Sequence, residues 1–76
     1  MDNDTRQRFI HMLDYEKQTA HDLRDITRVR ECIAFCQGMI LTLIATDADN
    51  ELELYAQKIQ GDMYNLWHEL NNDRQL

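Results

Sequence analysis

The sequence predicts an all-α protein with one small domain over residues 1–76. Two copies of this domain are expected to form a dimeric helical bundle. The chain has no proline and only two glycines, so little in it interrupts a helix. Apolar residues recur at steps of three and four, the period of an amphipathic helix, and no long alternating strand pattern is present. Domains this small bury only about 60% of the surface that the unfolded chain exposes, so association with a second copy is a common source of stability.

The N-terminal segment predicts a helix over residues 5–17, with Asp4 as its N-cap. The stretch that follows, KQTAHD, is nearly all polar. The chain therefore either breaks near residue 18 and forms three helices, or continues as one helix from about 5 to 45. The apolar patch of this segment consists of Phe9, Ile10, Met12 and Leu13.

Two further helices, over residues 20–45 and 49–71, are expected to form an antiparallel hairpin. Between them, the acidic stretch ATDADNELE has N-cap residues followed three positions later by carboxylates, and such carboxylates suit the dipole at a helix start. In an antiparallel pair of helices, the numbers of two facing residues add up to a nearly constant sum. The apolar residues of the two helices can be paired in this way, for example Leu43 with Leu52. In this register Gly38 and Gly61 are expected where the two backbones approach closely, which would compensate for glycine within a helix.

Residues 32–46 carry no charged side chain, although the chain as a whole is rich in charge. A membrane span needs roughly 20 predominantly apolar residues, and a secretory signal would lie at the N-terminus. This run is shorter and more central, so we expect it to be covered by protein. The hairpin covers only one of its faces, and a helix that is apolar nearly all round is normally buried.

A second copy of the chain is the preferred cover for the remaining face, because twofold symmetry brings the same patch from both subunits. A helix over 5–17 that folds back would stop short of this face, whereas a continuous first helix would place its apolar patch over the partner in an antiparallel dimer. A docking surface for a different protein and a monomer with another fold are the alternatives. The predicted self-association or partner interface consists of Phe35, Met39, Leu41, Ile44, Phe9 and Leu13.

The formal net charge is −6, and most of the acidic excess falls in residues 46–76. This excess disfavours a sequence-independent grip on nucleic-acid phosphates or on anionic membranes. A basic protein surface is the predicted partner, and a nucleic-acid regulator that uses an arginine strip is the alternative. The strip consists of Arg24, Arg28 and Arg30, and the acidic residues expected to face a basic partner are Asp47, Asp49, Glu51 and Glu53.

No motif predicts catalysis, a metal or a cofactor. The acidic turn fails as a calcium loop, since Leu52 and Lys58 stand where glycine and glutamate are needed. Cys32 and Cys36 lie four residues apart without a second ligand pair, so we expect them to pack in the core of a protein in a reducing compartment, the cytoplasm. The sequence thus predicts a non-enzymatic protein, without a small-molecule substrate, that acts by protein–protein contact as an accessory factor, inhibitor or chaperone-like adaptor.

Overall fold

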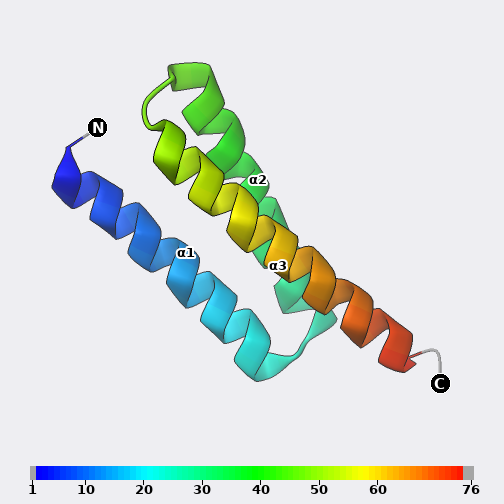
Figure 1. The fold of residues 1–76 in the computed structure, drawn as a ribbon. Helices are drawn as coiled ribbons and strands as arrows, with labels where there is room; N and C mark the ends of the chain where they lie inside the picture. Colours follow the sequence, from blue (N-terminus) through cyan, green and yellow to red (C-terminus); the bar gives the residue numbers. More distant parts are fainter. Residues whose placement is uncertain (1, 75–76) are drawn as a thin grey trace.

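The computed structural model describes residues 2–74 as three helices that run down, up and down in the view of Figure 1. They are α1 (Asn3–Leu23), α2 (Ile26–Thr46) and α3 (Asn50–Arg74). The bundle is elongated, with extents of 46 × 20 × 15 Å. The all-α prediction is confirmed, and no strand occurs within residues 2–74.

α1 is longer than predicted at both ends. Its N-cap is Asp2, whose carboxylate accepts a hydrogen bond of 2.7 Å from the backbone N–H of Thr5, so the prediction of Asp4 as the cap was wrong. The helix then continues through the polar stretch KQTAHD to Leu23. The alternative of three separate helices is therefore confirmed, although the break lies at residues 24–25 rather than near residue 18, and the alternative of one continuous helix from about 5 to 45 was wrong.

The chain reverses between α1 and α2 over two residues, without a glycine. Arg24 adopts the left-handed conformation, with φ 47°, and its backbone N–H donates to the carbonyl of Ala20. Asp25 then caps α2 by accepting a hydrogen bond of 2.8 Å from the N–H of Thr27. As a result α2 begins at Ile26 rather than near residue 20.

The turn between α2 and α3 lies where the sequence predicts it. Asp47 ends α2 in the left-handed conformation, with φ 49°. Asp49 caps α3, because its carboxylate accepts a hydrogen bond of 3.0 Å from the N–H of Leu52. α3 then runs to Arg74, slightly beyond the predicted end near residue 71, and the antiparallel hairpin is confirmed.

The core lies mainly between α2 and α3, which make the most extensive contact, while α1 packs against both. The predicted stripes are largely correct. Cys32 and Ala56 are buried in the core, whereas Ile33 and Tyr55 beside them in sequence are half-buried and pack against it. The buried residues are Leu13 and Ala20 on α1; Val29, Cys32, Cys36, Ile40 and Leu43 on α2; and Leu52, Ala56, Ile59, Met63, Leu66 and Leu70 on α3.

The two glycines are not explained by packing within the chain. A Cβ atom added at Gly38 or at Gly61 would meet nothing within 4 Å, and both residues are exposed. The expected close approach of the two backbones was therefore wrong. Each glycine therefore lowers the stability of its helix by about 1 kcal/mol relative to alanine, and no contact inside this chain offsets this loss.

α2 is long and apolar enough, by length and composition, to cross a membrane, and no other helix within residues 2–74 meets this criterion. The uncharged run is thus part of a 21-residue helix, and its length alone does not exclude a span. The core helix of a soluble protein passes the same test, but only 28% of the apolar segment of α2 is buried inside this chain. Much of this apolar helix is left without cover.

Candidate interaction surface

Two residues of the predicted interface pack inside the chain, because α1 is long enough to lie along the whole of α2. Leu13 is 0% exposed and belongs to the core, so its assignment to an interface is corrected. Phe9 is half-buried and packs against the same core. The prediction that the first helix would stop short of this region was wrong.

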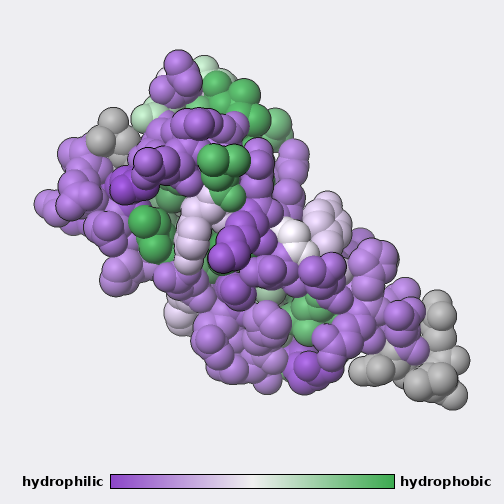
Figure 2. All heavy atoms as spheres, viewed as in Figure 1, coloured by the Kyte–Doolittle hydropathy of each residue, from purple (hydrophilic) through white to green (hydrophobic). Residues whose placement is uncertain are grey.

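Of the other four predicted interface residues, two lie on the side of α2 that faces away from the core and two pack at the edge of the core. Leu41 and Ile44 are each 55% exposed, and Phe35 and Met39 are half-buried. Figure 2 shows apolar atoms gathering at the end of the molecule where the C-terminal half of α2 lies. We call the exposed side of α2, with Ala34, Gly38, Leu41, Thr42 and Ile44, the outer face.

An apolar groove of about 480 Å³ runs beside the outer face, between α1 and α2. No charged side chain is among the described residues that line it. Met12, which is 44% exposed, adds apolar surface from α1 that was not included in the predicted interface. The main lining residues of this α1–α2 groove are Phe9, Met12, Phe35, Met39 and Thr42.

A second groove of about 370 Å³ lies on the opposite side of the outer face, between α2 and α3. Ala34 borders both grooves, so the outer face forms a ridge between them. Tyr64 and Trp67 stand three residues apart on α3, beside its apolar stripe, and this spacing is the sequence signal that would have identified them. The main lining residues of this α2–α3 groove are Arg30, Ile33, Gln37, Tyr64 and Trp67.

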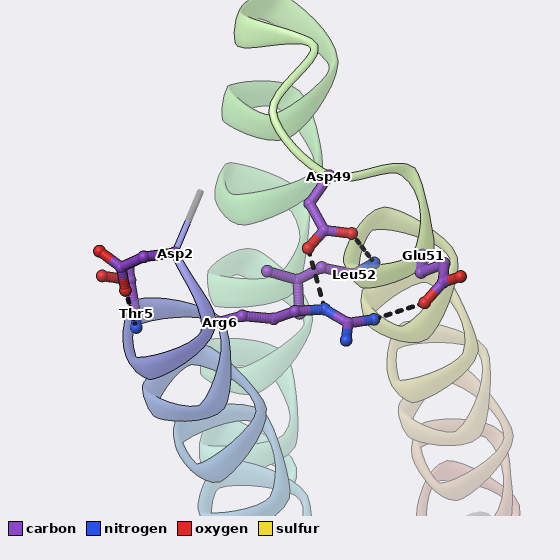
Figure 3. A network of polar contacts seen from close by, with 6 residues as sticks. All are labelled: Asp2, Thr5, Arg6, Asp49, Glu51 and Leu52. Carbon is purple, nitrogen blue, oxygen red and sulfur yellow. Dashed lines mark hydrogen bonds and ion pairs between the residues drawn. The ribbon is translucent and has the colours of Figure 1, made fainter.

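The acidic turn is partly neutralised by Arg6 of α1 (Figure 3). Arg6 Nε lies 2.9 Å from Asp49 Oδ2, and its Nη2 donates to Glu51 Oε2 at 2.7 Å. The N–H of Leu52 and then Arg6 hold the pKa of Asp49 below its usual value. Asp49 and Glu51 are thus engaged within the chain, whereas Asp47 forms no ion pair with another described residue.

Glu53, the fourth acidic residue proposed to face a partner, lies in the first turn of α3 and is half-buried. Like Asp47, it makes no ion pair within the described part of the chain. Two of the four acidic candidates are therefore available for a basic partner.

The arginine strip is largely engaged in ion pairs. Arg28 lies 3.3 Å from Glu16 and 3.4 Å from Glu31, and Arg24 lies 3.1 Å from Glu69. Arg30 makes no ion pair with another described side chain and borders the α2–α3 groove. Arg30 is thus the one member of the arginine strip without an ion pair in the described part of the chain.

The two cysteines are free and both 0% exposed. The neighbouring thiol of Cys36, followed by burial, raises the pKa of Cys32. Within the described residues, no group of three or more histidine, cysteine or carboxylate side chains is placed to hold a metal ion. The pair packs in the core as a small apolar unit.

Comparison with protein-family models, with curated proteins and with solved structures finds no match for this chain. The fold and the surface therefore define the class of protein by themselves. It is a small three-helix bundle whose second helix carries an exposed apolar ridge between two grooves.

Proposed function

We propose that the protein is non-enzymatic and acts by protein–protein contact, as a small accessory factor, inhibitor or chaperone-like adaptor that associates with itself through the outer face of α2. One observation carries this proposal: Leu41 and Ile44 each leave more than half of their side chain in water, within a run of fifteen uncharged residues. Contiguous apolar surface of this kind on a small protein marks an interaction site.

The grooves support contact with another protein more than chemistry on a small molecule. Both are wide open along the surface, and the described residues around the α1–α2 groove include no titratable side chain. A catalytic site needs convergent polar groups with perturbed pKa values in a concave pocket. Apolar side chains from a partner are the better occupants of these grooves.

The acidic charge of the chain supports a basic third partner for the assembled protein. The net charge is −6, and Glu53 is not neutralised by an ion pair within the described chain. A surface of one sign speeds the encounter with a surface of the opposite sign. The two free thiols suit a reducing compartment, and we propose the cytoplasm.

Sedimentation equilibrium of the wild-type protein and two matched variants tests self-association. Leu41→Asp places a charge on the outer face, while Leu54→Asp places it on α3, at a residue that is equally exposed at 56%. We expect a wild-type dimer at low micromolar concentration, a dissociation constant raised more than about tenfold by Leu41→Asp, and little change with Leu54→Asp. A well-folded wild-type monomer at all accessible concentrations would contradict the proposal.

A further inference from the structure

We infer that a second copy of the chain packs antiparallel along the outer face of α2, with the twofold axis passing close to Gly38. This inference rests on the proposed self-association and adds the orientation and register of the two copies. The space at Gly38, the charges at the two ends of α2 and the place of the α2–α3 groove support it.

Gly38 lies near the middle of the outer face, and a Cβ atom there would meet nothing within 4 Å. Ala34 and Thr42, one turn to either side, are exposed and small. The backbone of another helix can therefore approach α2 most closely at this point. Close contact with a second copy supplies the compensation for a mid-helix glycine that the chain itself does not provide.

The charges along α2 set the orientation. Arg30 and Asp47 stand at opposite ends of the helix, and neither forms an ion pair with another described residue. Glu31, the acid nearest to Arg30 in sequence, is already paired with Arg28. A parallel pair of α2 helices would place Asp47 beside Asp47 and Arg30 beside Arg30. An antiparallel pair centred on Gly38 places Arg30 of each copy beside Asp47 of the other.

The same register gives the exposed leucine of α2 a place to pack. At 100° per residue, Leu41 projects from the side of the outer face that borders α3, as Gln37 does. A twofold axis through Gly38 carries Leu41 of the second copy to the level of Phe35. There it lies over the α2–α3 groove, next to Tyr64 and Trp67. A parallel dimer would place it over the α1–α2 groove instead.

Trp67 is the only tryptophan, so its fluorescence reports on the α2–α3 groove. The antiparallel dimer predicts that dilution below the dissociation constant shifts the Trp67 emission to longer wavelength and raises its quenching by iodide. An emission that stays unchanged while sedimentation shows the dimer dissociating would overturn the antiparallel register.

Charge exchange tests the contact between the ends. We expect Arg30→Glu and Asp47→Arg each to weaken the dimer about threefold or more, the size of an exposed ion pair, and the double variant to recover most of this loss. Arg8→Glu, at an exposed residue of α1 away from both grooves between the helices, is the control for net charge. A double variant weaker than either single variant would oppose the inference.

Disulfide trapping separates the two orientations most directly. Ala34→Cys and Thr42→Cys variants are mixed under reducing conditions and then oxidised; the native thiols are fully buried and do not compete. The antiparallel dimer predicts a mixed disulfide between the two variants and little disulfide with either variant alone. Strong dimers from each variant alone would overturn the antiparallel arrangement and leave the proposed self-association intact. A wild-type protein that sediments as a monomer would contradict both the antiparallel arrangement and the proposed self-association.

Discussion

Arg6 Nε lies 2.9 Å from Asp49 Oδ2, an ion pair that joins the start of α1 to the start of α3. The same guanidinium donates to Glu51, and the carboxylate of Asp49 also accepts from the N–H of Leu52 (Figure 3). One arginine thus ties α1 to the turn that ends α2. This contact holds α1 against the half of α2 where the α1–α2 groove lies.

Replacing Arg6 with alanine should lower the free energy of unfolding by about 0.5–1 kcal/mol at low ionic strength, because the ion pairs are partly exposed. The difference from wild type should shrink in 1 M salt, where the Debye length is about 3 Å. Urea denaturation at low and high salt measures both effects. Arg8→Ala removes a neighbouring exposed arginine that has no ion pair in the described chain, and equal losses from the two variants would contradict this role of Arg6.

Asp49 should make stability depend on pH in the acid range. The hydrogen bond from the N–H of Leu52 lowers the pKa of folded Asp49 below the usual 3.8, and the charge of Arg6 lowers it further. Its contribution is therefore fully present above the unfolded pKa and is lost as pH falls through the folded pKa. Urea denaturation at pH 6 and near pH 3 should show a smaller acid loss for Asp49→Asn, which keeps an N-cap side chain, than for wild type.

Two variants complete this test of Asp49. Asp49→Ala should be less stable at neutral pH than Asp49→Asn, because the N-cap is lost together with the charge. Asp4→Asn removes an exposed carboxylate from the first turn of α1 and should leave most of the acid dependence in place. An Asp49→Asn protein with the full acid loss of wild type would show that other carboxylates carry it.

The hairpin was predictable from the sequence because its signals are local. Leu43 and Leu52 lie on matching stripes, and the acidic residues before α3 are typical of a helix start. The turn between α1 and α2 has no such signal, since Arg24 takes the left-handed conformation that glycine or asparagine usually takes. The end of α1 was therefore placed too early, and Leu13 was assigned to an interface instead of the core.

The grooves could not be predicted, because they depend on how three helices pack. Arg6 and Asp49 are far apart in sequence, and only the full length of α1 brings them together. Leu41 and Ile44 were identified correctly as apolar residues that one chain leaves exposed, since a hairpin covers only one side of α2. The periodicity of apolar residues in one chain shows that Leu41 and Ile44 are exposed but does not identify the surface that packs on them.

Tyr55 should ionise late in an alkaline titration. Its hydroxyl donates a hydrogen bond to the carboxylate of Asp14, which raises the pKa of Tyr55 to about 12. Tyrosinate absorbance should show a component near pH 12 that disappears in Tyr55→Phe and moves to lower pH in Asp14→Asn. Because the folded pKa is raised, this contact stabilises the protein below the unfolded pKa of about 10 and is lost as pH rises through 12.

Cys32 and Cys36 should resist modification in the folded protein. Both are 0% exposed, so a reagent reaches neither thiol while the protein is folded. Alkylation at pH 8 should therefore be slower by orders of magnitude than in urea, and its rate should follow unfolding. A cysteine introduced at exposed Leu54, away from the outer face of α2, should react rapidly under the same conditions. Rapid native labelling of Cys32 would show that α1 does not cover it.

Matched substitutions at Gly38 and Gly61 distinguish an effect on folding of the single chain from an effect on its association. An added Cβ atom at either residue meets nothing within 4 Å, so Gly38→Leu and Gly61→Leu should each stabilise the single chain by roughly 0.8 kcal/mol through helix propensity alone. Only the leucine at Gly38 stands on the outer face of α2. Gly38→Leu should therefore remove the dependence of the thermal midpoint on protein concentration, while Gly61→Leu keeps it. Equal behaviour of the two variants would place the association surface elsewhere on the bundle.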